Sequence, residues 1–96
     1  MNEREIERSL VNAVKRLGGI APKFVSPGCG GMPDRIILLP GGKIAFVEVK
    51  TIGRKPRPLQ LHRHGTLRRL GFKAFVLDGE EQITQLLSAI IGGDAE

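Results

Sequence analysis

Between Glu3 and Leu17, apolar residues recur at the three- and four-residue spacing of an amphipathic helix. Gly18 and Gly19 follow at once, and glycine readily adopts the left-handed conformation that ends many helices. The pattern therefore predicts a first helix over this segment. Glu7 lies at the border of its apolar stripe and not on its far side. The stripe itself consists of Ile6, Leu10, Ala13, Val14 and Leu17.

The middle of the chain carries short apolar runs separated by turn residues, which is typical of strands. Two runs, at 35–39 and 43–49, flank Pro40-Gly41-Gly42 and predict a β-hairpin. Both runs are apolar at nearly every position, which indicates burial on both faces and a central place in a sheet covered by helices. A shorter strand is predicted at 23–25, just before the glycine-rich loop "SPGCGG", and another at 73–78.

Two further helices follow from their start and stop signals. The segment 58–70 begins with Pro58, which suits the first turn of a helix, and is followed by Gly71. Asp78 and Glu81 predict a capping box at the start of a last helix. The predicted order is α-β-β-β-α-β-α, which indicates an α/β fold, and a chain of 96 residues suits one domain over 1–96.

The charge of the chain points to a polyanionic partner. The 15 Lys and Arg residues outnumber the 10 Asp and Glu residues, which gives a formal net charge of +5. Between Val49 and Leu77 there are eight cations and no carboxylate. The single cysteine, Cys29, has no partner for an internal disulfide, and no apolar run approaches the roughly 20 residues of a membrane span. These features predict a cytoplasmic protein that binds DNA and no membrane.

Three charged residues interrupt the apolar hairpin. Glu48 and Lys50 point to the same side of one strand, because successive strand side chains alternate. A two-residue turn would place Asp34 opposite Val49, whereas a three-residue turn would place it opposite Glu48. Two facing carboxylates repel each other, and a hard divalent cation such as Mg²⁺ or Mn²⁺ relieves that repulsion. With a lysine beside them, this constellation suits phosphodiester hydrolysis.

These residues also form a known motif. Pro33-Asp34, followed after the hairpin by Glu48-Val49-Lys50, resembles the PD-(D/E)XK nuclease superfamily. The strings "GGMPDRIILLPGGKIAFVEVK" and "PLQLHRHGTLRRLGF" resemble the VRR-NUC family within it, in its compact stand-alone form. The resemblance implies a restriction-endonuclease-like core with a central mixed sheet flanked by helices. It also implies metal ligation by Asp34, Glu48 and the carbonyl of Val49, and catalytic roles for Lys50, Gln60 and Glu7, with Glu3 as the alternative to Glu7.

The cations that follow this motif are interpreted as contacts to DNA phosphates, since they come directly after the catalytic lysine. They are Arg54, Lys55, Arg57 and, on the next helix, Arg63. A zinc site at His62 and His64 is a weaker alternative. Positions i and i+2 of a helix lie about 200° apart and cannot bind one ion together.

The sequence therefore predicts an Mg²⁺- or Mn²⁺-dependent DNA endonuclease. The family resemblance implies selectivity for branched or four-way-junction DNA over a specific base sequence. A non-catalytic basic DNA-binding module and a nuclease subunit of a larger nucleoprotein complex are the alternatives. A homodimer is expected, because cutting paired strands needs two sites. Candidate interface residues are Leu86, Ile91 and the loop around Cys29.

Overall fold

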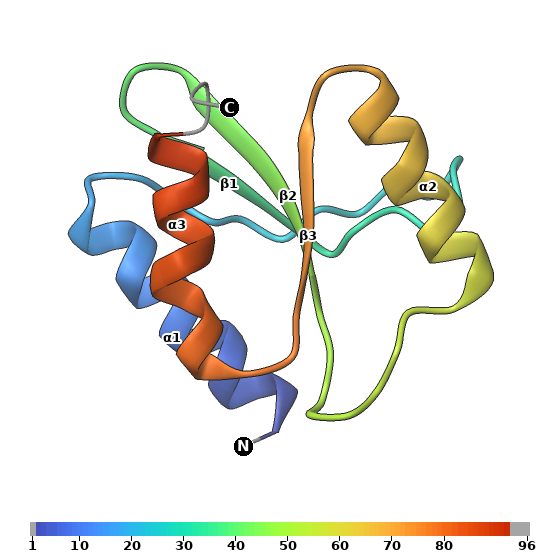
Figure 1. Cartoon of the computed structure of the whole chain (residues 1–96), viewed down its shortest axis with the longest axis horizontal. Coiled ribbons are helices and arrows are strands. Elements are labelled where there is room, and N and C mark those ends of the chain that lie inside the picture. Colours follow the sequence, from blue (N-terminus) through green and yellow to red (C-terminus); the bar gives the residue numbers. More distant parts are fainter. Residues whose placement is uncertain (1, 93–96) are drawn as a thin grey trace.

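A mixed three-stranded sheet lies between helices on both of its faces (Figure 1). The structure is a computed structural model and describes residues 2–92. The sheet order is β1-β2-β3, with β1 and β2 antiparallel and β2 and β3 parallel. The predicted α/β class and helix-flanked mixed sheet are confirmed. In chain order the elements are α1 (Glu3–Arg16), β1 (Arg35–Leu39), β2 (Lys43–Val49), α2 (Pro58–Arg69), β3 (Lys73–Leu77), a 3₁₀ turn (Glu80–Gln82) and α3 (Ile83–Ile91).

The turn between β1 and β2 sets the register of the hairpin. Leu39 pairs with Lys43, so that three residues form the connection. Gly41 and Gly42 both have positive φ, at 85° and 75°, a conformation that glycine adopts at no steric cost. Continuing the same register by one residue beyond the Arg35 pair places Asp34 opposite Glu48. Of the two turns considered from the sequence, the three-residue turn is the one that forms.

The two faces of the sheet carry two separate cores. On one face, α1 and α3 pack against the side chains of alternate strand residues, and in Figure 1 these two helices lie together on one side of the sheet. On the other face, α2 buries Leu67 against Phe46 and Ala74. Side chains at the end of the sheet can therefore receive partners from α1 on one face and from α2 on the other. The first core includes Ile6, Leu10, Val14, Ile37, Val47, Val49, Leu77, Ile83 and Leu87.

Helix α1 has a well-defined start. The Oδ1 atom of Asn2 accepts a hydrogen bond from the Glu5 N–H at 2.9 Å, and Oε1 of Glu5 accepts one from the Asn2 N–H at 3.0 Å. This reciprocal pair is a capping box, which satisfies two of the N–H groups that a helix leaves free at its start. The cap and the buried stripe together fix the position of Glu7 relative to the sheet.

The predicted strand at 23–25 does not form a regular strand. The chain before and within this segment makes two isolated bridges to β1, between Ile20 and Leu38 and between Lys23 and Arg35, and only the second lies in the predicted strand. Pro22 lies between the bridges and has no N–H, so a continuous ladder cannot form across it. The segment still covers the outer edge of β1, because its backbone exchanges hydrogen bonds with that strand.

The start of the last helix also differs from its prediction. The expected partner Glu81 does not cap; instead Gln82 donates from Nε2 to Oδ1 of Asp78 at 2.7 Å and accepts from the Asp78 N–H at 3.1 Å. A 3₁₀ turn precedes α3, which moves the capping side chain one residue along. Leu86, named as an interface candidate, is only 6% exposed and belongs to the core, whereas Ile91 is 46% exposed. No helix within residues 2–92 is long and apolar enough to cross a membrane.

Candidate active site

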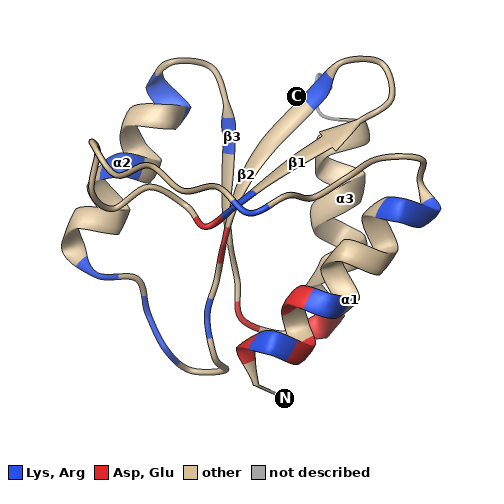
Figure 2. Cartoon of the chain, turned by 180° about the vertical axis from the view of Figure 1, so that it is seen from behind, with Lys and Arg blue, Asp and Glu red and all other residues tan. Residues whose placement is uncertain are grey.

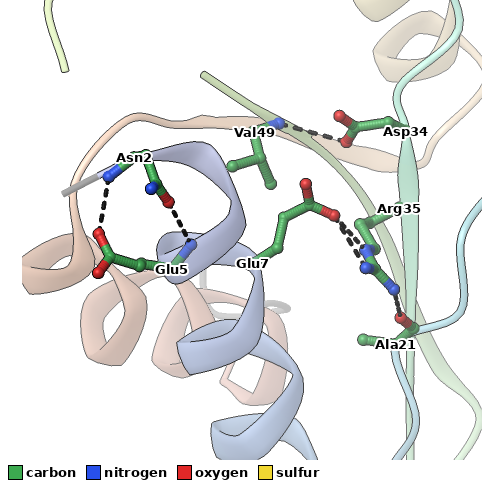
Figure 3. A network of polar contacts seen from close by, with 7 residues as sticks. All are labelled: Asn2, Glu5, Glu7, Ala21, Asp34, Arg35 and Val49. Atoms are coloured by element: carbon green, nitrogen blue, oxygen red, sulfur yellow. Dashed lines mark hydrogen bonds and ion pairs between the residues drawn. The ribbon is translucent and has the colours of Figure 1, made fainter. Parts of the chain in front are cut away.

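Asp34 and Glu48 lie on neighbouring strands at the open end of the hairpin. Asp34 precedes β1, and its Oδ1 accepts a hydrogen bond from the Val49 N–H at 3.3 Å (Figure 3). Glu48 is the penultimate residue of β2 and is only 4% exposed. The register of the hairpin therefore selects the alternative in which Asp34 lies opposite Glu48. Neither carboxylate lies in the bulk solvent that would normally screen its charge.

The two oxygens of Glu48 have different surroundings. Oε2 accepts a hydrogen bond from Nε2 of Gln60 at 3.0 Å, and Nζ of Lys50 lies 3.6 Å from the same atom. Oε1 is buried and has no hydrogen-bond partner within the described chain. Gln60 comes from the first turn of α2, where its own Oε1 accepts the Arg57 N–H at 2.8 Å. That second bond fixes the amide orientation, so Gln60 can only donate to Glu48.

The burial of these carboxylates has an electrostatic cost. Burial, with a smaller contribution from the nearby charge of Glu7, raises the pKa of Asp34 to about 6, although the Val49 hydrogen bond opposes the shift. Burial and the Asp34 charge together raise the pKa of Glu48 to about 7, against the opposing effects of Lys50 and Gln60. Like charges in a partly desolvated site cannot both ionise without a penalty. The site therefore stores repulsion that a bound cation would relieve.

Glu7 reaches the site from the opposite face of the sheet. Its Oε1 accepts two hydrogen bonds from Arg35, from Nε at 3.0 Å and from Nη2 at 2.8 Å. Arg35 follows Asp34 in the chain, so its side chain points to the α1 face while that of Asp34 points to the α2 face. The alternative residue, Glu3, instead accepts a hydrogen bond from the Thr51 hydroxyl at 3.3 Å. Between the two, Glu7 is the acidic residue of α1 whose charge acts on Asp34.

Sequence reasoning missed Arg35. An arginine at the head of an otherwise apolar strand was the available signal, because a charged side chain there needs a partner on the face that it enters. The structure supplies two: Glu7 and the carbonyl of Ala21, to which Nη1 donates at 2.8 Å.

The predicted DNA contacts divide into two groups. Arg54, Lys55 and Arg57 are exposed in the segment between β2 and α2, and Figure 2 shows blue stretches along this segment. Arg63 is half-buried and donates from Nε to the Gly30 carbonyl at 2.7 Å, which ties α2 to the glycine-rich loop. The other three side chains face solvent, and DNA contacts by all four residues stay predictions.

The two histidines of α2 do not share a site. His62 is exposed, whereas His64 is fully buried one turn after Gln60, and neither of its ring nitrogens has a hydrogen-bond partner among the described residues. Burial lowers the pKa of His64, and the charges of Arg68 and Lys50 lower it further. This imidazole is therefore neutral near pH 7. The zinc alternative fails, as the helical spacing of the two residues predicted.

The donor atoms at the hairpin end fit a hard divalent cation. Within residues 2–92, no three His, Cys, Asp or Glu side chains gather into a group that could hold a metal ion, so the side-chain donors here are Asp34 and Glu48. The buried Oε1 of Glu48 has no proton donor, and a carboxylate oxygen left in this state is costly unless a cation or a proton reaches it. Oxygen donors of this kind suit Mg²⁺ and Mn²⁺.

The raised pKa values predict how stability depends on pH in metal-free buffer. The pKa of Asp34 is about 6 and that of Glu48 about 7 in the folded chain, against ordinary values of 3.8 and 4.5. The folded chain therefore keeps both protons to higher pH than the unfolded chain does. The resulting destabilisation is absent below about pH 4 and complete above about pH 7. Asp34→Asn should therefore raise the free energy of unfolding at pH 8 by about 1 kcal/mol or more, with little gain at pH 4.

Thermal melts in EDTA at both pH values measure this difference, and the exposed Glu81→Gln serves as the matched control. An equal gain from Asp34→Asn at pH 4 and pH 8 would contradict the electrostatic account, since it would reflect packing alone.

Comparison with known proteins gives concordant results. The chain is 49% identical over 90 residues to the "Putative nuclease p44" of Acyrthosiphon pisum secondary endosymbiont phage 1, and the alignment covers 94% of this chain and 96% of that protein. A solved structure described as a VRR_NUC domain superposes with a TM-score of 0.83 at 34% identity, covering 90% of this chain and 94% of the other. No family model matches the chain.

A second solved structure, described as a VRR_NUC domain protein, supports the fold alone. It superposes with a TM-score of 0.71 at 24% identity and covers 96% of this chain and 89% of the other. The motif, the hairpin geometry and the relatives that align over nearly the full length agree. The chain belongs to the VRR-NUC family of nucleases, within the PD-(D/E)XK superfamily.

Proposed function

We propose that this nuclease is a metal-dependent DNA endonuclease that prefers branched DNA, such as four-way junctions, to a specific base sequence. The observation that carries the proposal is the pair of partly or fully buried carboxylates, Asp34 and Glu48, with Nζ of Lys50 3.6 Å from Glu48. Such a pair is unfavourable for stability alone, and perturbed carboxylates of this kind cluster at catalytic sites. The net charge of +5 favours a nucleic-acid substrate.

Asp34, Glu48 and the carbonyl of Val49 are the groups that would hold Mg²⁺ or Mn²⁺. A bound divalent ion supplies Lewis-acid polarisation of a phosphate oxygen and a more acidic water. The chain's own groups then have distinct tasks. Lys50 brings a positive charge next to the carboxylates, where the negative charge of a reacting phosphate builds up. Gln60 holds Oε2 of Glu48 and leaves Oε1 available.

The exposed cations of the 54–57 segment are proposed to hold the DNA backbone. Arg57 ends this segment next to the site, because its N–H donates to Oε1 of Gln60, whose Nε2 donates to Glu48. Contacts to the DNA backbone carry no base information, which agrees with recognition by shape. The preference for branched DNA rests on the family resemblance, and cleavage of duplex, flap, single-stranded and four-way-junction DNA tests it directly.

We also propose that the nuclease acts as a homodimer. A single site cuts one strand, and two sites related by a two-fold axis would cut both strands or nick a junction symmetrically. The exposed Leu17 and Ile91 flank an apolar depression that also includes Leu39 and Pro40. This surface is the candidate for contact with a second copy, because Leu86 is buried.

The carboxylates and the lysine should respond differently to substitution. Asp34→Asn and Glu48→Gln should lose Mn²⁺ binding and DNA cleavage together, since both remove an anionic donor. Lys50→Ala should keep Mn²⁺ and DNA binding but lose cleavage by on the order of 100-fold or more. Calorimetric Mn²⁺ titration and a cleavage assay on each purified variant measure these effects.

Lys50→Met keeps the length of the half-buried stem and controls for lost packing. The substrates are duplex, flap, single-stranded and four-way-junction DNA, each with Mg²⁺, Mn²⁺ or EDTA. Full cleavage by Glu48→Gln would refute the site assignment. DNA binding without metal-dependent cleavage of any substrate would instead favour a non-catalytic module or a subunit that needs a larger complex.

Reversing the basic segment should weaken DNA binding to all sequences alike. The slope of log affinity against log salt is negative, and each lost phosphate contact makes it less steep by about one unit. The triple variant Arg54→Glu, Lys55→Glu and Arg57→Glu should therefore bind duplex DNA more weakly and with a flatter slope. Fluorescence anisotropy over a series of salt concentrations measures both quantities.

A matched control with the same change in net charge is available on the outer face of α1. Arg8, Lys15 and Arg16 are exposed there, and reversing them alters the long-range field without touching the basic segment. The control should lose less affinity for DNA than the triple variant does. Its slope of log affinity against log salt should equal that of the wild-type protein. Equal slopes in both variants would mean that residues 54–57 contribute net charge and no contacts.

The dimer proposal is decided by mass. Light scattering at micromolar concentration should give a protein mass of twice the 10.5 kDa chain, either alone or, after the DNA mass is subtracted, on junction DNA. Ile91→Arg should restore the monomer mass, because a buried charge at a two-fold contact is opposed by its own copy. A monomer mass in both conditions with paired nicking intact would show two independent binding events.

A further inference from the structure

Arg35 is held more firmly than a surface arginine. Its guanidinium donates from Nε and Nη2 to one oxygen of Glu7, at 3.0 and 2.8 Å, and from Nη1 to the Ala21 carbonyl at 2.8 Å. The side chains of Arg35 and Glu7 are only 14% and 23% exposed. A planar guanidinium bonded on two sides has little freedom to rotate. Arg35 therefore fixes where the carboxylate of Glu7 lies.

The same contacts leave one oxygen of Glu7 unused. Both bonds from Arg35 end on Oε1, and Oε2 takes part in neither. In Figure 3 this second oxygen points away from Arg35 and toward the space between Asp34 and Val49. Glu7 thus presents an acceptor to the candidate active site from the α1 side, while Glu48 and Gln60 occupy the α2 side.

Without Arg35, electrostatics would oppose this position. Asp34 and Glu48 already repel each other, and a third carboxylate nearby adds to the repulsion. Glu7 has a flexible side chain on a helix surface, so it would otherwise turn toward water. The charge of Arg35 offsets that of Glu7 next to Asp34. Glu7 stays at the border of the site, since no group of three acidic side chains gathers within residues 2–92.

We propose that Arg35 is a positioning residue that aims Oε2 of Glu7 into the site, where this oxygen accepts a hydrogen bond from the water that attacks the phosphate. Glu7 then orients a water and is not a direct metal ligand. The role of Arg35 is exerted entirely through Glu7. This inference rests on the proposed nuclease activity and assigns the two residues to one unit within that site.

Glu7→Gln is a sharp test of this arrangement. The Gln oxygen can still accept from Arg35, which leaves an NH₂ group facing the site, and that group cannot accept a hydrogen bond from water. The variant should therefore melt near the wild-type temperature and bind Mn²⁺ and DNA normally, yet lose roughly 10- to 100-fold in kcat. The exposed Glu81→Gln, which removes a carboxylate outside the site, is the control and should cleave normally.

Arg35→Gln, alone and combined with Glu7→Gln, tests whether Arg35 affects cleavage only through Glu7. Cleavage is measured well below the melting temperature of every variant, together with Mn²⁺ calorimetry and thermal melts. Arg35→Gln should lose kcat by a similar factor with little change in KM for DNA, and the double variant should be no slower than Glu7→Gln alone. Arg35→Lys keeps the charge but cannot donate to Glu7 and to the Ala21 carbonyl in the geometry of a guanidinium. Its kcat should therefore fall between those of the wild-type protein and Arg35→Gln.

The outcomes separate this inference from the proposed function. Additive losses in the double variant, or full kcat in Arg35→Gln with only a lower melting temperature, would overturn the positioning role while the nuclease function stands. A loss of Mn²⁺ affinity in Glu7→Gln would make Glu7 a direct ligand and also overturn it. If the wild-type protein binds Mn²⁺ but cleaves none of the DNAs, the proposed function fails and this inference fails with it.

Discussion

The structure depends on one unfavourable contact, the approach of two carboxylates at the open end of a hairpin. The three-residue turn at residues 40–42 brings Asp34 opposite Glu48. A slip of one residue in this register would turn every side chain of one strand to the opposite face. The register is secured by burial on both sides, since Ile37 and Val47 enter one core and Phe46 the other. Burial of the hairpin's apolar residues thus holds Asp34 opposite Glu48 although the two carboxylates repel each other.

Polar groups on both faces of the sheet offset part of the repulsion between these carboxylates. From α2, Gln60 donates to Glu48, and from the strand itself Lys50 adds a positive charge. From the α1 side, Arg35 balances Glu7, so that a third carboxylate can lie near Asp34. A sheet covered on one face only could not receive partners from both directions. Natural proteins commonly accept local instability of this kind where activity requires it.

The parts of the fold that the sequence predicted well are those controlled by local rules. The first two helices begin where predicted and end one residue early, because their stripes and glycine stops are local signals. The strand at 23–25 was predicted wrongly, because Pro22 has no N–H and interrupts the ladder that would join this segment to β1. Within the site, Asp34 and Glu48 could be singled out as charges that interrupt apolar runs, but only the structure decided between the two turn lengths. The role of Arg35 was missed, because its partners Glu7 and Ala21 lie 28 and 14 residues away.

Phosphodiester hydrolysis would need negative charge to bind a cation and positive charge to bind the DNA phosphates. The acidic end of the hairpin supplies the first, and the positive segment after β2 supplies the second. A site lined by carboxylates repels a phosphate, so a substrate polyanion would avoid it without compensation. Lys50 offsets part of this repulsion within the site, and Arg54, Lys55 and Arg57 follow at once on an exposed segment that contains no carboxylate. Since exposed charges act only over about 10 Å at moderate salt, the compensating cations have to lie close to the carboxylates. The structure brings the end of this segment back to the carboxylates, because the Arg57 N–H donates to Oε1 of Gln60, and Nε2 of the same amide donates to Glu48.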